Sequence, residues 1–157
     1  SNDGYIEQKV DKTLADVRKG SYPYFAEGDI IIAKITPCME NGKCALATDL
    51  TNGIGFGSSE FHVFRVNDKL INNVYLFAYL NRREIRTRAA EVMTGSSGHR
   101  RVPISFYEDL EIPVPSMEMQ MEIAKKYKNM VSEMEKIKQY IANSSSAKQA
   151  ILDKYLK

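Results

Sequence analysis

The chain has 157 residues, of which 43% are hydrophobic and 27% are charged, and its formal net charge is +2. This composition allows one packed domain with an appended element, and it excludes wholesale disorder and a histone-like polycation. No apolar run approaches the ~18 residues of a membrane span, and no leader is recognisable, so we expect a cytoplasmic protein that contacts no membrane. Ser1-Asn2 precedes sequence of mid-protein character, so a truncated N-terminus is expected.

The charges and cysteines narrow the function classes further. Residues 82–101 hold six arginines against two glutamates, whereas residues 1–71 carry a net charge of −2. A local arginine cluster is typical of a phosphate-facing patch, although an ordinary solvated helix face is the alternative. Cys38 and Cys44 are too few for a disulfide scaffold and lack the partners of a zinc finger, so reduced cysteines and no metal are expected.

The first half of the chain predicts an antiparallel sheet. The first twenty residues are polar and favour a strand or a short helix. A β-branched run at 30–35 predicts a strand, and Asn41-Gly42 predicts a hairpin turn leading to a return strand at 43–48. The Gly- and Ser-rich residues 49–59 predict a loop, and residues 60–66 predict a further strand.

The second half predicts helices. Asn72-Asn73 can cap one helix from about Val74 to Met93, whose basic second half projects from the core. A glycine-bounded loop follows at 94–101, and Pro113 and Pro115 end the globular part.

A long helix is predicted after Glu118, and its apolar residues recur at spacings of 4, 3, 4, 3 and 4. This heptad seam indicates pairing with another helix. The Ser-rich residues 143–146 are expected to weaken the helix. The predicted fold is α+β: a mixed, β-rich domain over 1–115 with packed helices, then a coiled-coil-type helix over 116–157. The helix-pairing residues are Ile123, Tyr127, Met130, Met134, Ile137 and Ile141.

The constellations that an enzyme needs are incomplete. Asp29 and Lys34 match the outer residues of a metal-nuclease strand, but the middle acidic position is Ile32, so the metal would not be held. The glycines of 53–57 lack the spacing and context of a nucleotide-binding turn. We therefore expect a non-catalytic binding module that needs no cofactor.

Three polar loops have side chains suited to nucleic acid, namely residues 34–43, 57–60 and 94–101. Glycine lets backbone amides approach phosphate, and hydroxyl, Lys and Arg side chains supply donors. An ordinary surface turn is the alternative for each loop. The third loop, with two consecutive arginines after an arginine-rich helix, carries the strongest signal.

Residues 28 to about 123 resemble the target-recognition domain of the specificity subunit of type I restriction-modification enzymes. The matching segments are 28–37, 41–43, 55–61 (with Ser59 where the family has Thr), Thr94-Gly95-Ser96 with Arg101, and the junction 112–123. Met119 separates Glu118 from Gln120, where family members often have adjacent Glu-Gln. The five segments occur in the family's order.

The resemblance implies recognition of one half of a bipartite double-stranded DNA target. It also implies long helices that pair antiparallel, set the distance between the halves and dock the methyltransferase and restriction subunits. We expect phosphate contacts from the arginine-rich helix end (residues 82–88) and Lys43. The residues expected to contact bases are Lys34, Thr36, Asn41, His99, Arg100 and Arg101. The chain would then be a fragment of a two-domain subunit, a half-subunit that forms a homodimer, or the tail of a fused enzyme.

The residues predicted to bind DNA are Lys34, Thr36, Asn41, Lys43, Ser58, Ser59, Arg82, Arg83, Arg86, Arg88, Thr94, Ser96, Ser97, His99, Arg100 and Arg101. Two alternative functions stay open. One is a protein-interaction adaptor that displays a coiled-coil helix, and the other is a metal nuclease.

Overall fold

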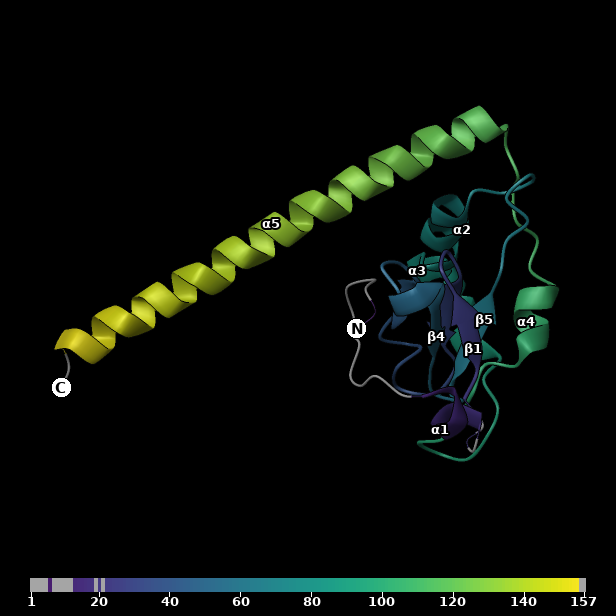
Figure 1. Cartoon of the computed structure of the whole chain (residues 1–157), viewed down its shortest axis with the longest axis horizontal. Coiled ribbons are helices and arrows are strands. Elements are labelled where there is room, and N and C mark those ends of the chain that lie inside the picture. Colours follow the sequence, from purple (N-terminus) through teal and green to yellow (C-terminus); the bar gives the residue numbers. More distant parts are fainter. Residues whose placement is uncertain (1–5, 7–12, 19, 21, 156–157) are drawn as a thin grey trace.

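The structure is a computed structural model, and it describes residues 6, 13–18, 20 and 22–155. Most of the prediction for the first twenty residues lies outside this range. The described elements are α1 (Leu14–Arg18), β1 (Tyr24–Ala26), β2 (Ile30–Ala33), β3 (Cys44–Leu46), a 3-10 turn (Thr51–Gly53), β4 (Ile54–Phe56), β5 (Phe61–Phe64), α2 (Asn73–Leu80), α3 (Arg83–Glu91), α4 (Ile104–Glu108) and α5 (Met117–Tyr155). The fold is α+β, as predicted, and α5 extends far beyond the body of the domain (Figure 1).

β2 is the central strand of the larger sheet. It pairs antiparallel with β3 on one side and with β5 on the other, so that Ile31 lies opposite Ala45 and Val63. The predicted strand, its return strand and the strand after residue 60 are therefore confirmed, each shorter than expected. β1 and β4 form a separate antiparallel ribbon.

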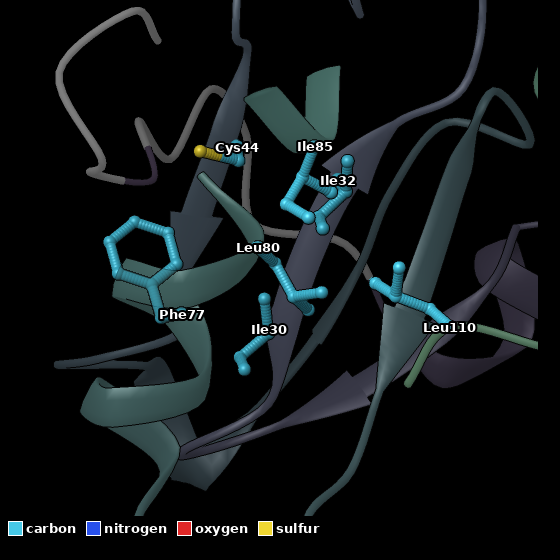
Figure 2. Packing of buried hydrophobic residues seen from close by; sticks show 7 residues of the cluster. All are labelled: Ile30, Ile32, Cys44, Phe77, Leu80, Ile85 and Leu110. Carbon is cyan, nitrogen blue, oxygen red and sulfur yellow. The ribbon is translucent and has the colours of Figure 1, made fainter. Parts of the chain in front are cut away.

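The unbroken apolar run of β2 is explained by burial on both faces of the sheet. Ile30 and Ile32 enter a cluster with Phe77, Leu80 and other residues of the helical layer, as Figure 2 shows. The other members of this cluster are Cys44, Ile85 and Leu110. Ile31 points to the opposite face and packs with Phe25 and Ala47. A strand exposed on one face would instead alternate between apolar and polar residues.

The prediction of one helix over residues 74–93 is wrong. The helix stops at Leu80 and restarts at Arg83, and Arg82 between them has an extended backbone (φ −58°, ψ 139°). Leu80 and Ile85 both enter the main core, although five residues of a continuous helix turn through about 140° beyond a full circle. The break lets both side chains face the same core. The basic segment therefore does not project: Ile85 and Ala89 are buried.

Two further local predictions need correction, and a third concerns α5. The connection between β2 and β3 runs over residues 34–43, so it is longer than a two-residue hairpin turn, and only Gly42 within it has a positive φ. The segment predicted as loop contains β4, because Phe25 in β1 lies opposite Gly55. α5 runs through the serines at 144–146, which the sequence predicts to weaken it, without ending there, and the Ser145 hydroxyl donates to the Ile141 carbonyl (3.1 Å).

Asp29, directly before β2, is almost fully buried, and its carboxylate accepts three hydrogen bonds. Arg65 donates through Nε (2.8 Å) and Nη2 (2.7 Å), and the Ala26 amide donates a third hydrogen bond (2.7 Å). Burial alone would raise the pKa of Asp29, but the hydrogen bonds from Arg65 and Ala26 outweigh it and lower that pKa.

Asp29→Asn should therefore lower the free energy of unfolding by about 2 kcal/mol at neutral pH, the usual size for hydrogen bonds to a charged group. A lowered pKa stabilises the fold above the ordinary value of 3.8 and ceases to do so as pH falls through the native value. The difference between wild type and Asp29→Asn should shrink in urea titrations below about pH 4. A difference that is constant with pH would contradict this assignment.

α5 spans 39 residues, which corresponds to about 58 Å of helix. The domain covers the N-terminal part of α5: Gln120 and Ala124 are buried, and residues 127–138 line a groove that α5 shares with α2 and β3. Met130, Met134, Ile137 and Ile141 are nevertheless at least 49% exposed. Among the described residues, no helix has the length and apolar character needed to cross a membrane.

Candidate nucleic-acid interface

The three polar loops singled out in the sequence meet on one side of the domain. We call residues 34–43, 57–60 and 94–101 loops one, two and three. Backbone hydrogen bonds join loop one to loop two (Lys34 N to Glu60 O, 2.9 Å) and loop one to loop three (Thr36 N to Arg100 O, 3.0 Å). The backbone of Arg101 also forms isolated antiparallel β-bridges with Ile35 and with Thr94. Loops distant in sequence thus form one surface, which together with α3 we call the loop surface.

A small apolar cluster beneath the loop surface holds it together. Met39 of loop one packs with Ala89 of α3, with Met93 and with Val102, and these four side chains are at most 6% exposed. The Val102 carbonyl also lies 2.9 Å from Nε2 of His62 on β5, and burial lowers the pKa of this histidine. Loop one, α3 and the end of loop three are therefore held in a fixed relation by packing.

Arg101 of loop three is engaged with Glu60 of loop two. Its Nε and Nη2 each donate to a carboxylate oxygen at 2.8 Å, and Nη1 donates to the His99 carbonyl (2.9 Å). The hydrogen bonds from Arg101 hold the pKa of Glu60 below its usual range. This bidentate pair fixes the two loops to each other.

Arg100 is turned toward α3. Its Nη2 donates to the carbonyls of Ala90 (3.0 Å) and Met93 (3.1 Å), and the side chain is half-buried. These carbonyls lie at the C-terminal end of α3, where helix carbonyls lack intrahelical partners and where positive charge is favourable. Arg100 thus caps α3, and in this geometry its guanidinium is occupied within the protein.

Arg86 of α3 lies against the turn of loop one. Gly42 there has φ +72°, and a Cβ at this position would collide with the Arg86 guanidinium. The positive φ favours glycine at residue 42, and a larger residue there would also displace the end of the Arg86 side chain. Arg86 Nε is buried and has no hydrogen-bond partner within the described part of the chain.

Four cationic side chains of the loop surface, unlike those of Arg100 and Arg101, have no hydrogen-bonding partner within the described residues. Lys34, Lys43, Arg83 and Arg88 are half-exposed or exposed, and within the described residues their side chains make no hydrogen bond or ion pair. Arg82 differs, since it pairs with Glu84 (2.6 Å) and lies over the Tyr79 ring.

The polar residues predicted to bind DNA also lie on this surface. The Thr36 hydroxyl donates to Glu40 (2.6 Å), and Ser58 Oγ accepts from the Glu60 amide (3.2 Å). The remaining predicted residues are exposed, namely Asn41, Ser59, Thr94, Ser96, Ser97 and His99.

Sequence reasoning missed two residues that shape the loop surface, Glu60 and Met39. Glu60 stands within the matching segment 55–61, but its partner Arg101 is 41 residues away, and no spacing rule connects them. Met39, between a cysteine and a glutamate, lacked any periodic signal because it lies in a turn.

The residues considered for a metal nuclease do not form a metal site. The Asp29 carboxylate is bound by Arg65 and the Ala26 amide. Within the described residues no group of three or more His, Cys, Asp or Glu side chains is placed to hold a metal ion.

Comparison with known proteins identifies the family. A sequence model of the type I restriction modification DNA specificity domain matches residues 5–143. The chain belongs to this family. It is 39% identical over 154 residues to the type I restriction enzyme EcoAI specificity subunit of Escherichia coli, and 34% identical over 154 residues to the EcoEI specificity subunit of the same organism. Each match covers 98% of this chain and 26% of the relative, so the chain spans about a quarter of these subunits.

A solved structure supports the assignment. The HsdS subunit from Thermoanaerobacter tengcongensis matches 82% of this family member and 32% of its own chain, with a TM-score of 0.57 and 25% identity. The resemblance predicted from the five sequence segments is thus confirmed.

Proposed function

We propose that the chain is the part of a specificity subunit that reads one half of a bipartite double-stranded DNA target, without catalysis of its own. One observation carries this proposal: loops one, two and three and α3 converge on a single rigid surface that presents unpaired cations. Phosphate contacts position a protein on DNA, and base contacts supply specificity. In this role the protein would act in the cytoplasm.

The loop surface supports a division of work among its side chains. Arg83 and Arg88 on α3, with Lys34 and Lys43, are the proposed phosphate contacts, because they have no competing side-chain partner within the described residues. Asn41 and His99 are exposed at the tips and are the proposed base readers. Arg100 and Arg101 shape loop three, and either would have to leave its present partners before contacting a base.

Salt dependence of duplex binding tests this proposal. In mobility-shift titrations the logarithm of the binding constant should fall linearly with the logarithm of salt concentration, by about 0.9 per phosphate neutralised. Arg83→Ala combined with Arg88→Ala should weaken binding to all sequences and reduce this slope by about 2, without changing the melting temperature.

Lys148→Ala, an exposed cation far along α5, is the matched control and should leave the slope unchanged. Arg100→Ala should instead lower the melting temperature, because it removes the cap of α3. If no duplex pool is shifted even at low salt, the DNA-recognition proposal fails and the adaptor alternative is favoured.

We also propose that the exposed seam of α5 pairs antiparallel with an equivalent helix, from a second copy or from a second recognition domain of a longer subunit. Ile123, Met130, Met134, Ile137 and Ile141 are between 36% and 59% exposed, an unusual state for apolar residues at heptad spacing. Tyr127, which shares the seam, contacts Phe77 of its own domain. Methyltransferase and restriction subunits are the further proposed partners.

A further inference from the structure

The polar side chain of Gln120 is buried at the start of α5. It is 1% exposed, and nearly all its hydrogen-bonding capacity is used. Its Oε1 accepts from the Asn72 amide (2.8 Å), and its Nε2 donates to the carbonyls of Pro115 (2.9 Å) and Leu70 (3.2 Å). A buried amide with three partners is held in one orientation, because leaving any partner unpaired is costly.

The partners of Gln120 belong to separate parts of the chain. Asn72 caps α2, since its side chain accepts from the amides of Val74 (3.0 Å) and Tyr75 (3.1 Å). The extended segment before α5 is tied to the same helix, because the Tyr75 hydroxyl donates to the Pro113 carbonyl (2.7 Å). Gln120 therefore connects α5 to the start of α2, to the loop before α2 and to its own linker.

A second anchor lies about two helical turns further along α5. Ala124 is buried, and the Tyr127 ring packs edge-on against Phe77 of α2 with ring centroids 6.0 Å apart. Seven residues separate Gln120 from Tyr127, or about 10 Å along the helix axis. Two anchors on one face define a direction, whereas a single anchor would let the helix pivot. α5 then runs along a groove that it shares with α2 and β3 as far as Lys138, and its C-terminal part projects from the domain (Figure 1).

We infer that Gln120 is the positioning residue that fixes the direction of α5 relative to the loop surface, and that it thereby sets which separation of two DNA half-sites is accepted. The second half of this inference rests on the proposed function. The reason is geometric, since a small pivot at the base of a helix about 58 Å long displaces its far end, and any domain paired there, by many ångströms.

Gln120→Met tests the joint without DNA. Methionine has a similar volume, but it leaves the Asn72 amide and two carbonyls without partners, whereas the fold keeps the Phe77 contact. Gln139→Met is the matched control, because Gln139 is exposed on the same helix. Spin labels at Glu108→Cys and Asn143→Cys, both exposed, report the direction of α5 by pulsed electron paramagnetic resonance.

The distance is measured in a Cys38→Ser, Cys44→Ala background, so that the spin labels attach only at the two introduced cysteines. The labelled chain is diluted with unlabelled chain, so that the measured distances are those within one molecule. Wild type and Gln139→Met should give one narrow distance. Gln120→Met should lose it and give a broad or shifted distribution at a temperature where all variants are folded. An unchanged narrow distance in Gln120→Met would overturn the inference.

Selection from a random duplex pool then tests the consequence for spacing. The wild-type chain should enrich paired half-sites at one separation, and Gln120→Met should enrich the same half-sites at several separations. Enrichment at the wild-type separation alone would overturn the assignment of spacing to Gln120. If the wild type enriches no half-sites, the proposed function fails, whereas the distance measurement still decides whether Gln120 fixes the helix.

Discussion

Replacing Ile137 and Ile141 by glutamate should abolish association of the chain through α5. Both side chains are more than half exposed, so the folded domain does not depend on them. In a paired seam each would be buried, and loss of an isoleucine contact removes at least about 1.5 kcal/mol. A symmetric dimer contains four such sites, so the dissociation constant should rise on the order of ten thousandfold. Light scattering over a concentration series measures this directly.

The control variant introduces the same two negative charges on α5, but at positions outside the seam. Gln139→Glu with Asn143→Glu adds two negative charges at exposed outward positions of the same helix, four residues apart as in the test pair. This variant should associate like the wild type, and both variants should melt like it. A wild-type chain that stays monomeric at every concentration would contradict pairing of α5 with a second copy of the chain.

Phe77→Ala should produce the largest loss of stability of any single substitution considered for the domain. Phe77 is 5% exposed, belongs to the main core cluster with Ile30 and Leu80, and carries the ring contact to Tyr127. Truncation of a buried phenylalanine costs about 3–5 kcal/mol, because it loses apolar burial and leaves a cavity. Urea unfolding at neutral pH measures the difference.

Leu70→Ala is the matched comparison, because Leu70 is 64% exposed and contributes only its backbone carbonyl to Gln120. Its free energy of unfolding should stay within about 0.5 kcal/mol of wild type. Equal losses in Leu70→Ala and Phe77→Ala would mean that the core is not organised around Phe77.

The proposed roles of the loop surface and of α5 require different properties from the same small domain. The loops need fixed shapes to present cations and amides, and they obtain them from the apolar cluster around Met39 and from the Glu60–Arg101 pair. In the proposed function, α5 keeps an exposed apolar seam that is available to another helix. The contact between α5 and the domain lies in the N-terminal half of the helix, from Gln120 to the groove lined by residues 127–138, so the C-terminal half stays exposed.

Local patterns were sufficient for the elements whose residues act on near neighbours. The apolar run at β2 and the heptad spacing in α5 both repeat within a few residues, so they predicted a buried strand and a long exposed seam. The order of the five matching segments identified the family for the same reason, because each segment is read without knowing its spatial neighbours. The three polar loops were likewise recognisable from their composition.

Tertiary structure alone decided how these parts meet. The sequence by itself determined the strand, the seam, the loops and the family, because periodicity and turn chemistry are properties of adjacent residues. It could not show that α2 and α3 separate so that Leu80 and Ile85 share a core, or that Arg100 and Arg101 have partners within the protein. Nor could it show that Gln120 reaches back to Asn72. These contacts join residues that become neighbours only when the chain folds. A local sequence pattern therefore cannot predict them.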